Sequence, residues 1–594
     1  MTHTKNDKAA AHEGSVKETL IAILISLTIA LAARSYATEA FIIPTGSMAP
    51  TLYGAHLNYH FDENGAEWAS DVWYRGSDPN KTPIAVQTVA DSAGRITEAP
   101  SATVMYAAPM SEAARDTSIP MPAEINAEVP RIPPISYRTS AGDRILVHKY
   151  LYHLREPKRF DVVVFKSPEE IAQNYIKRLL GLPSETVWLA GGDVFSTTDV
   201  PARLSNGRTV PPPDSRWSIR RKPERIQKSL WRPVYSSEYA PLDNKHNGRK
   251  WFDCPWSGDD WQTYDAANDR DLTVYRADTA DPTMLSWNAD TWPITDYTPY
   301  NDQDSNRTRV GVYSPRLGSF EQFVLPVSDV RIRAGVEPDQ AGLSVSATIH
   351  ARSHEFRAVI EDGAARILMH HENAENWSEM ASAPVTPFAA HKVTDIEFWH
   401  ADQSLSIYIN SKRVAYAEYN WGPSERLLHA TGHAGIDYAE GGPAAQLQLD
   451  QTFVYTQDFP RIEWNFAGSA LSLHRVGVDH DVYYRADTDP FDDDPGFGTH
   501  PDNLAIIGPD QFFTCGDNSA ASHDARLWGS VNPQVLKQFK DTRGPEWENS
   551  EDKLRGVVPR QLMLGKAYCV YFPAPFSFSG RIPIPNVARM RAIR

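Results

Sequence analysis

The stretch that decides the fold is residues 142–165, GDRILVHKYLYHLREPKRFDVVVF, whose last letters read as an apolar, strand-like run. The following segment, NYIKRLLGLPSETV at 174–187, places a lysine, Lys177, before a Gly-Leu-Pro turn. Apolar residues surround it in sequence: Tyr175, Ile176, Leu179 and Leu180. We expect this lysine to be held in apolar surroundings. The alternative is an ordinary surface charge on a strand.

A serine with no obvious base lies far upstream. FIIPTGSMAPTL, residues 41–52, sets Ser47 between a glycine and a methionine. A serine hydroxyl is a poor nucleophile unless a base takes its proton, and the chain has no G-x-S-x-G elbow. A lysine can act as that base only when neutral, which requires burial. Lys177 is the candidate.

Four motifs lie at separate places along the chain, and their order matters for the interpretation. They are SMAPTL at 47–52, GDRILVHKYLYHLREPKRFDVVVF at 142–165, YIKRLLGLPSETV at 175–187 and GDNSAASHDAR at 516–526. In this order they resemble the successive motifs of bacterial type I signal peptidases, the membrane-anchored Ser/Lys proteases that remove signal peptides from exported proteins. The resemblance covers well under half of the chain.

The resemblance implies a role for each matching residue. Ser47 would be the nucleophile and Lys177 the general base. The Ser47 N–H and the hydroxyl of Thr45, where many members have serine, would form the oxyanion hole. Ser522 would hydrogen-bond the lysine ammonium and orient it.

Two ion pairs are implied as scaffold rather than chemistry. Arg178 would pair with Asp517, and Asp524 with Arg526. A carboxylate in direct contact with the catalytic lysine would stabilise its charged form and spoil it as a base, so a supporting place is expected. No metal or other cofactor is implied.

The N-terminal region contains an apolar run. TLIAILISLTIALAA, residues 19–33, follows three lysines, and Ser35-Tyr36-Ala37 would suit a cleavage site, so a cleaved signal peptide is one interpretation. The resemblance favours the other, an uncleaved transmembrane anchor over 17–40. In both cases the lysines place residues 1–16 in the cytoplasm and the body outside the inner membrane.

We predict a mostly β protein with one N-terminal transmembrane helix and a peptidase core split by insertions. The core would comprise residues 41–55, 140–200 and 505–580. A Pro/Ala-rich insertion, 56–139, reads as a long, partly ordered loop, and 581–594 as a basic, solvated tail.

The second insertion, residues 201–504, is larger than the core. Period-2 alternation in VRIRAGV, GLSVSATIH, FRAVIEDGAARILMH and LSIYINSKRVAYAEY predicts a sandwich over about 325–455, with a hairpin turn at Asp362-Gly363. Residues 393–415 resemble the strand pair of concanavalin-like or laminin-G-like sandwiches, which often bind carbohydrate. A sandwich without a ligand is the favoured interpretation, and the partner of the insertion stays unknown.

Composition excludes some classes of function. A net charge of -16 over 594 residues, with no basic face, argues against nucleic-acid binding. The three cysteines have no zinc spacing, and one bridge, Cys515 with Cys569, is left open. Residues 487–503 are dense in oxygen ligands but lack EF-hand spacing, so a solvated acidic loop is favoured over a calcium site.

The resemblance therefore implies a serine endopeptidase acting on exported preproteins, with the lipid bilayer as its other partner. The residues before the cut would be small, such as Ala, at the first and third positions. The alternative is a catalytically silent, surface-anchored binding protein that works through the insertion. Intact Ser47, Lys177, Thr45 and Ser522 argue against that alternative.

Overall fold

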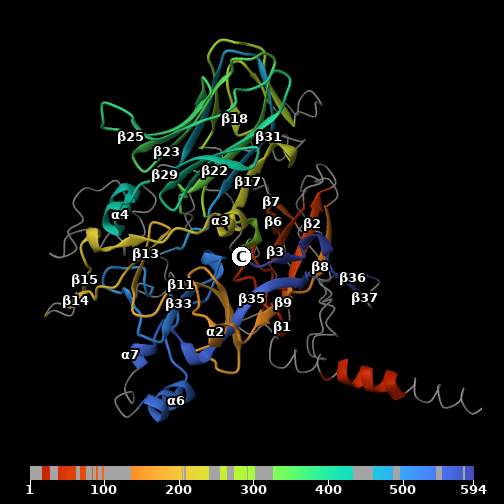
Figure 1. The fold of residues 1–594 in the computed structure, drawn as a ribbon, viewed down its shortest axis with the longest axis vertical. Coiled ribbons are helices and arrows are strands. Elements are labelled where there is room, and N and C mark those ends of the chain that lie inside the picture. The colour runs from red at the N-terminus through yellow and green to blue at the C-terminus, as the bar shows by residue number, and fades with distance from the viewer. Residues whose placement is uncertain are drawn as a thin grey trace, which may run out of the picture.

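The computed structural model is mostly β, as predicted (Figure 1). It describes residues 17–26, 28, 38–61, 67–71, 73–74, 83–84, 88–90, 96–98, 135–203, 205, 209–239, 254–263, 273–289, 292–296, 298–301, 325–431, 459–485, 496–543, 551–574, 576–578 and 582–594. The first part of the oxygen-rich segment 487–503, up to residue 495, lies outside these ranges.

The central sheet is antiparallel and is built from both ends of the chain. Successive valines of its strand β10 face different cores: Val163 packs with one buried cluster, Val162 and Val164 with another. Both faces are therefore covered, which explains the unbroken apolar run. Its strands, in order, are β1 (Thr38–Ile42), β9 (Arg144–His148), β35 (Met563–Phe572), β10 (Val162–Lys166), β11 (Asn174–Gly181), β33 (Gln511–Cys515) and β34 (Val558–Pro559), with β38 (Arg591–Ala592) beside β35.

A smaller sheet extends the core next to β11. Its central pair, β12 and β13, is almost wholly buried, with Trp188 and Phe195 as opposed residues. The order is β16 (Ser218–Ile219), β13 (Asp193–Thr197), β12 (Thr186–Ala190) and β32 (Ala505–Ile506), and a ribbon of β14 (Ala202–Arg203) and β15 (Thr209–Val210) follows β13 in the chain.

The segment expected to be a partly ordered loop contributes strands to a third sheet. Residues 56–61 pair on one side with 67–71 and on the other with 135–140. The order is β3 (Glu67–Asp71), β2 (His56–Phe61), β8 (Ile135–Ser140), β36 (Phe576–Phe578) and β37 (Ile582–Ile584). Short ribbons are formed by β4 (Trp73–Tyr74) with β5 (Pro83–Ile84) and by β6 (Thr88–Ala90) with β7 (Ile96–Glu98).

The segment 581–594, predicted as a basic, solvated tail, is largely exposed in its described part but also makes contacts with the core. Arg591 and Ala592 pair with β35, and Ile593 is buried in the core beneath them. Arg589 forms an ion pair with the buried Asp143 at 3.1 Å. The Arg591 guanidinium donates to the Thr51 carbonyl at 2.6 Å. The segment is therefore attached to the core by β pairing, by Ile593 and by contacts of two arginines.

The large insertion folds into two facing sheets with one shared core. Asp362 and Gly363 adopt positive φ and form the turn between β24 and β25. The first sheet runs β19 (Trp261–Gln262), β20 (Val274–Ala277), β31 (Leu471–His480), β22 (Val330–Pro338), β27 (Thr394–Ala401), β28 (Ser404–Ile409) and β29 (Lys412–Glu418), with β17 (Arg232–Ser236) beside β31. The second runs β18 (Trp256–Ser257), β21 (Thr283–Trp287), β30 (Arg461–Ala467), β23 (Ser344–Ala351), β24 (His354–Glu361), β25 (Ala364–His371) and β26 (Ser378–Pro384).

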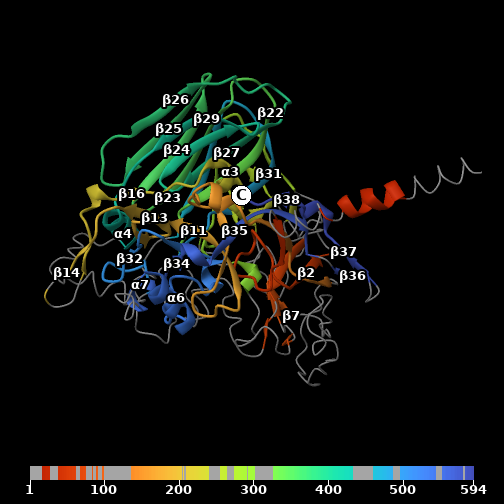
Figure 2. The ribbon, with the colours of Figure 1, turned by 60° about the horizontal axis from the view of Figure 1, so that its bottom comes forward.

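The sandwich is wider than the expected range of about 325–455. Strands from 232–287 and from 461–480 pair within both sheets. These strands were missed because several of them are only two to five residues long and lie far from the alternating segments. Figure 1 shows the sandwich above the central sheet and its neighbours, and Figure 2 shows the same division from a second direction.

The helices are short and lie around the sheets. They are α2 (Leu151–Leu154), α3 (Glu224–Leu230), α4 (Pro423–Thr431), α6 (Pro533–Arg543) and α7 (Glu551–Leu554), with 3-10 turns η3 (Asp214–Arg216), η4 (Ser237–Tyr239), η8 (Pro299–Asn301), η11 (Ser519–Ala521), η13 (Arg560–Leu562) and η14 (Val587–Arg589). Residues 17–26 are also helical.

Two expectations need correction. Residues 38–40, assigned to the anchor over 17–40, belong instead to β1, where Thr38–Ile42 pair in register with β9. In the part of the chain that the structure describes, no helix has both the length and the apolar character needed to cross a bilayer. Cys515 and Cys569 are free thiols, so the bridge left open between them is not formed.

Candidate active site

Ser47 and Lys177 meet although they are far apart in the sequence. Ser47 lies in the turn that follows β1. Lys177 lies on β11, which is between β10 and β33 in the central sheet. Lys177 Nζ and Ser47 Oγ are 2.7 Å apart and form a hydrogen bond. The base and the candidate nucleophile are therefore at proton-transfer distance.

The surroundings of Lys177 favour its neutral form. The residue is 4% exposed, and its neighbours Leu179 and Leu180 are fully buried. Burial lowers the pKa of Lys177 from 10.5 to about 8, although the Asp524 carboxylate acts in the opposite direction. A useful fraction of the lysine is consequently neutral near pH 8, as a general base requires.

The turn that carries the candidate nucleophile Ser47, called the nucleophile turn below, is held by its own side chains and by the GDN motif, residues 516–526. Met48 and Leu52 are buried in the core under β9 and β10. The Asn518 main-chain N–H donates to the Ser47 carbonyl at 3.0 Å, and its side-chain amide donates to the Gly46 carbonyl at 3.1 Å. The motif at 516–526 therefore clamps the backbone on which Ser47 sits.

Ser522 lies near Ser47, but its predicted hydrogen bond to Lys177 is not formed. Its Oγ is buried and has no hydrogen-bond partner among the described residues. It lies against Gly516, on the same side as the Ser47 carbonyl oxygen. Lys177 Nζ donates to Ser47 Oγ instead.

Arg178 and Asp517 form a bidentate ion pair with no exposure to solvent. Nε and Nη2 of Arg178 each donate to one carboxylate oxygen at 2.6 Å. Thr51 also donates to this carboxylate at 2.5 Å, and Arg178 donates to the main-chain oxygens of Phe160 and Arg594. The pair joins the nucleophile turn, β11 and the GDN motif, which agrees with a structural role.

Asp524 and Arg526 form the second buried pair. The Arg526 guanidinium donates to both carboxylate oxygens at 2.8 Å, and the Gly516 N–H donates to Asp524 at 2.8 Å. Arg526 holds the pKa of Asp524 below its ordinary value against the effect of burial. The pair therefore keeps the chain around Gly516 in place.

Thr45 precedes Ser47 by two residues and is exposed, and the backbone of Gly54 packs against its main chain. Thr45 therefore belongs to the same turn as Ser47. An oxyanion hole made by Thr45 and the Ser47 N–H remains a prediction.

Three residues of the large insertion contact the nucleophile turn or the GDN motif, and the sequence analysis did not identify them. They are Arg232, Asn301 and Tyr300. Arg232 on β17 donates to the carbonyls of Ala49 and Asp517. Asn301 in η8 exchanges two side-chain hydrogen bonds with Asn518, at 2.7 and 2.8 Å. No motif marked these residues, because they lie in the segment where the resemblance gives no guide.

Tyr300, also in η8, covers Gly46. A methyl group at Gly46 would come within 2.4 Å of the Tyr300 ring, and Tyr300 packs with Ala49 and Ala69 in a small buried cluster. The insertion is thus in direct contact with the residues before and after the candidate nucleophile.

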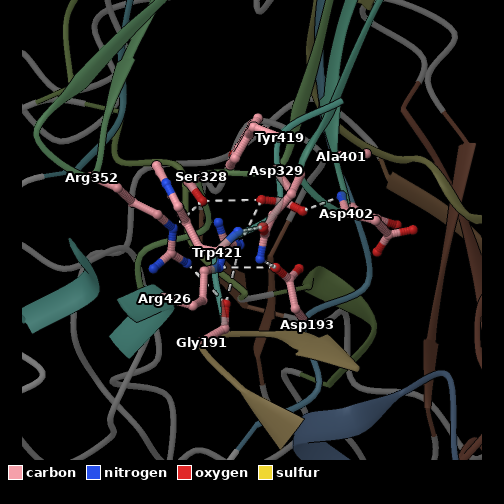
Figure 3. A network of polar contacts seen from close by, with 12 residues as sticks. Gly191, Asp193, Ser328, Asp329, Arg352, Ala401, Asp402, Tyr419, Trp421 and Arg426 are labelled. Carbon is pink, nitrogen blue, oxygen red and sulfur yellow. Dashed lines mark hydrogen bonds and ion pairs between the residues drawn. The ribbon is translucent and has the colours of Figure 1, made fainter. Parts of the chain in front are cut away.

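Two clusters in the described part of the chain contain groups that metals bind. Asp193, Asp329 and Asp402 converge in the network of Figure 3, but Arg426 pairs with the first two at 3.0 Å each. Lys222 forms an ion pair with Asp402. These cations satisfy the acidic cluster, so the network needs no metal. The other cluster consists of His354, His371 and His429.

Comparison with protein families gives a match to signal peptidases. Residues 134–206 match the family model described as "Signal peptidase, peptidase S26". The resemblance to signal peptidases is therefore confirmed over a segment that includes Lys177 and Arg178, and Ser47 and Ser522 lie outside the matched range.

Curated relatives point the same way over short stretches. Signal peptidase I of Leptolyngbya laminosa is 35% identical over 89 residues, 14% of this chain and 42% of that protein. Signal peptidase I of Pseudomonas aeruginosa is 45% identical over 58 residues, 8% of this chain and 20% of that protein. The chain thus spans less than half the length of these relatives.

Solved structures were matched as well. They include the carbohydrate binding module CBM66 from Bacillus subtilis, at 9% identity and a TM-score of 0.20, over 38% of this chain and 95% of that one. Galectin LEC-6 from Caenorhabditis elegans gives 13% identity and a TM-score of 0.15, over 26% and 86%. TM-scores this low carry no inference about the fold or a ligand.

Proposed function

We propose that the protein is a type I signal peptidase, a membrane-anchored serine endopeptidase that removes N-terminal signal peptides from exported preproteins. The observation that carries this proposal is the 2.7 Å contact between Ser47 Oγ and the Nζ of a buried lysine. The family match around Lys177 supports it. The remaining evidence is the arrangement of the four motifs around this contact.

In the proposed reaction, neutral Lys177 accepts the proton of Ser47 as its Oγ attacks the carbonyl before the cut. The Ser47 N–H and the Thr45 hydroxyl stabilise the oxyanion. The lysine then protonates the departing amine and leaves an acyl-enzyme. Water, deprotonated by the same lysine, hydrolyses this ester and regenerates Ser47.

The substrate would bind as an extended peptide that adds to a strand edge beside Ser47, with small residues at the first and third positions before the cut. The anchor over 17–37 and the cytoplasmic N-terminus belong to this proposal. An enzyme held at the outer face of the inner membrane would meet signal peptides where their cleavage sites emerge.

Cleavage of a preprotein with an Ala-x-Ala junction tests the proposal. The full-length protein in detergent should cut at that junction. Ser47→Ala and Lys177→Ala should each lower the cleavage rate at least ~1,000-fold, because removal of either member of a nucleophile–base pair disables both. Lys166, an exposed lysine at the end of the neighbouring strand, provides the matched control Lys166→Ala, which should cut normally.

Folding of each variant is checked by thermal unfolding. A folded wild-type protein that leaves several such preproteins intact would contradict the proposal. So would a Lys177→Ala variant that cuts as well as Lys166→Ala. The alternative of a silent binding protein would then be favoured.

A further inference from the structure

Three histidines of the insertion converge at one end of the sandwich. His354 begins β24, His371 ends β25 and lies directly opposite it, and His429 comes from α4. One nitrogen of each ring lies within 4.8 Å of those of the other two. The centroid of the His354 ring is 4.6 Å from the centroid of the His371 ring and 4.8 Å from that of the His429 ring.

We propose that His354, His371 and His429 form a binding site for a zinc ion. Three imidazoles with water in a fourth position are a known donor set for this metal, and imidazole suits it better than it suits magnesium or calcium. A tetrahedral site with Zn–N bonds of ~2.0–2.1 Å sets the nitrogens roughly 3.3 Å apart. The three nitrogens lie within 4.8 Å of one another, so zinc binding would draw them closer together through rotation of the side chains.

The hydrogen bond between His354 and the Arg352 carbonyl leaves the other ring nitrogen of His354 free to bind a metal. Its Nδ1 lies 2.8 Å from the Arg352 carbonyl oxygen, which can only accept, so Nδ1 carries the proton. The neutral ring then keeps its lone pair on Nε2. A backbone carbonyl on the second nitrogen is the usual partner of a metal-binding histidine, because it fixes both the tautomer and the ring orientation.

The other two rings are less constrained. The Asn373 N–H donates to His371 Nδ1 at 3.1 Å, so binding through Nε2 requires the other tautomer and the loss of this contact. His429 has Glu425 one helical turn earlier, with Oε1 3.9 Å from Nε2. Both rings are partly exposed, which leaves a route for the ion and for water.

The elements that carry the histidines are held in place by the buried network of Figure 3. Arg352, two residues before His354, donates to the Gly191 carbonyl at 2.9 Å. Arg426, one turn before His429, pairs with Asp193 and Asp329, so those carboxylates offset its charge near the cluster. The Trp421 ring packs on His354 and His429 at 4.8 and 4.3 Å.

The histidine next in sequence offers a matched control. His370 precedes His371 on β25 and therefore points to the opposite face of the sheet. It stacks on Trp377 and bonds the Ala374 carbonyl. Substitution of His370 removes an imidazole from the same strand without touching the cluster.

The test uses full-length protein without a histidine tag, stripped of metal and titrated with Zn²⁺ against a chromophoric chelator. Wild type and His370→Ala should bind one equivalent. His371→Ala and His429→Ala should each bind at least ~100-fold more weakly. Co²⁺ in place of zinc should give the visible absorption of a tetrahedral site, and zinc should raise the unfolding temperature of wild type but not of His429→Ala.

Because His371 and His429 are partly exposed, both variants should fold, and their metal-free unfolding temperatures should match wild type. Wild-type protein that takes up no stoichiometric zinc would overturn the proposal. Equal zinc affinity in all four proteins would overturn it too. Neither result depends on the proposed peptidase activity.

Discussion

Gly516 shows how tightly the candidate site is packed at the level of single atoms. A Cβ at this position would lie 2.2 Å from Ser522 Oγ and 2.4 Å from the Ser47 carbonyl oxygen. Real Cβ atoms do not approach so closely, so any side chain must push the nucleophile turn away from β33. The glycine is required by this contact rather than by a special backbone angle.

Gly516→Ala should therefore lower kcat for preprotein cleavage on the order of 100-fold, because a displacement of about 1 Å at the reacting groups costs that much. Gly529→Ala is the matched control, since nothing lies within 4 Å of a Cβ built there. Steady-state kinetics on both variants measure the effect. Equal rates for the two would show that the turn is not held against Gly516.

Sequence reasoning identified the residues with motifs and missed those without. Ser47 and Lys177 stand in recognisable motifs 130 positions apart, and they meet at 2.7 Å. The lysine's apolar setting could be read from its neighbours in β11. Asn301 and Arg232 could not be found, because their contacts with the site depend on the path of the whole insertion.

At the scale of elements, alternation of apolar residues predicted the long strands of the insertion well. β22, β23, β24 and β28 coincide with the quoted segments. Short strands such as β18 and β19 have only two residues each, which is too few to show the alternation of apolar and polar residues that marks a strand. The C-terminal strand β38 is only two residues long, and its arginine, Arg591, finds its hydrogen-bond partner, the Thr51 carbonyl, in a distant part of the chain.

The 3-10 turn η8 is the element through which the insertion touches the candidate site. Asn301→Ala removes both amide hydrogen bonds to Asn518, a residue only 1% exposed. An unsatisfied buried amide costs about 1–3 kcal/mol, so Asn518 should hold Ser47 less firmly and kcat should fall ~10-fold. Preprotein cleavage measures this.

Asn420→Ala is the control for that experiment. Asn420 is an exposed residue of the same insertion, and its side chain accepts a hydrogen bond from Arg221. Its substitution should leave cleavage unchanged. If Asn301→Ala behaves like this control, the insertion does not support the nucleophile turn.

At the scale of the whole molecule, the insertion and the sheets of the predicted peptidase core are joined by buried ion pairs. Arg426 of α4 pairs with Asp193 on β13 and with Asp329 before β22 (Figure 3). All three side chains are at most 9% exposed. A loosely tethered module would not bury ions at its junction, so the insertion is an integral part of the fold.

Arg426→Ala leaves two carboxylates buried without their cation. Removal of one partner of a buried pair typically costs ~3–5 kcal/mol, and we expect a loss of that order in the free energy of unfolding. Arg413→Ala, which removes a partly exposed pair with Glu224, should cost less than ~1 kcal/mol. Denaturant unfolding of both variants compares them, and equal losses would mean that the junction contributes little.

The central claim is that Lys177 acts as the base, and the pH dependence of kcat/KM for preprotein cleavage tests it most directly. Burial lowers the pKa of Lys177 to about 8, and only the neutral amine can accept the Ser47 proton. The rate should therefore rise about tenfold per pH unit below this value and level off above it. A rise centred near 6.5, the ordinary pKa of histidine, or a profile that is flat across this range, would contradict the account.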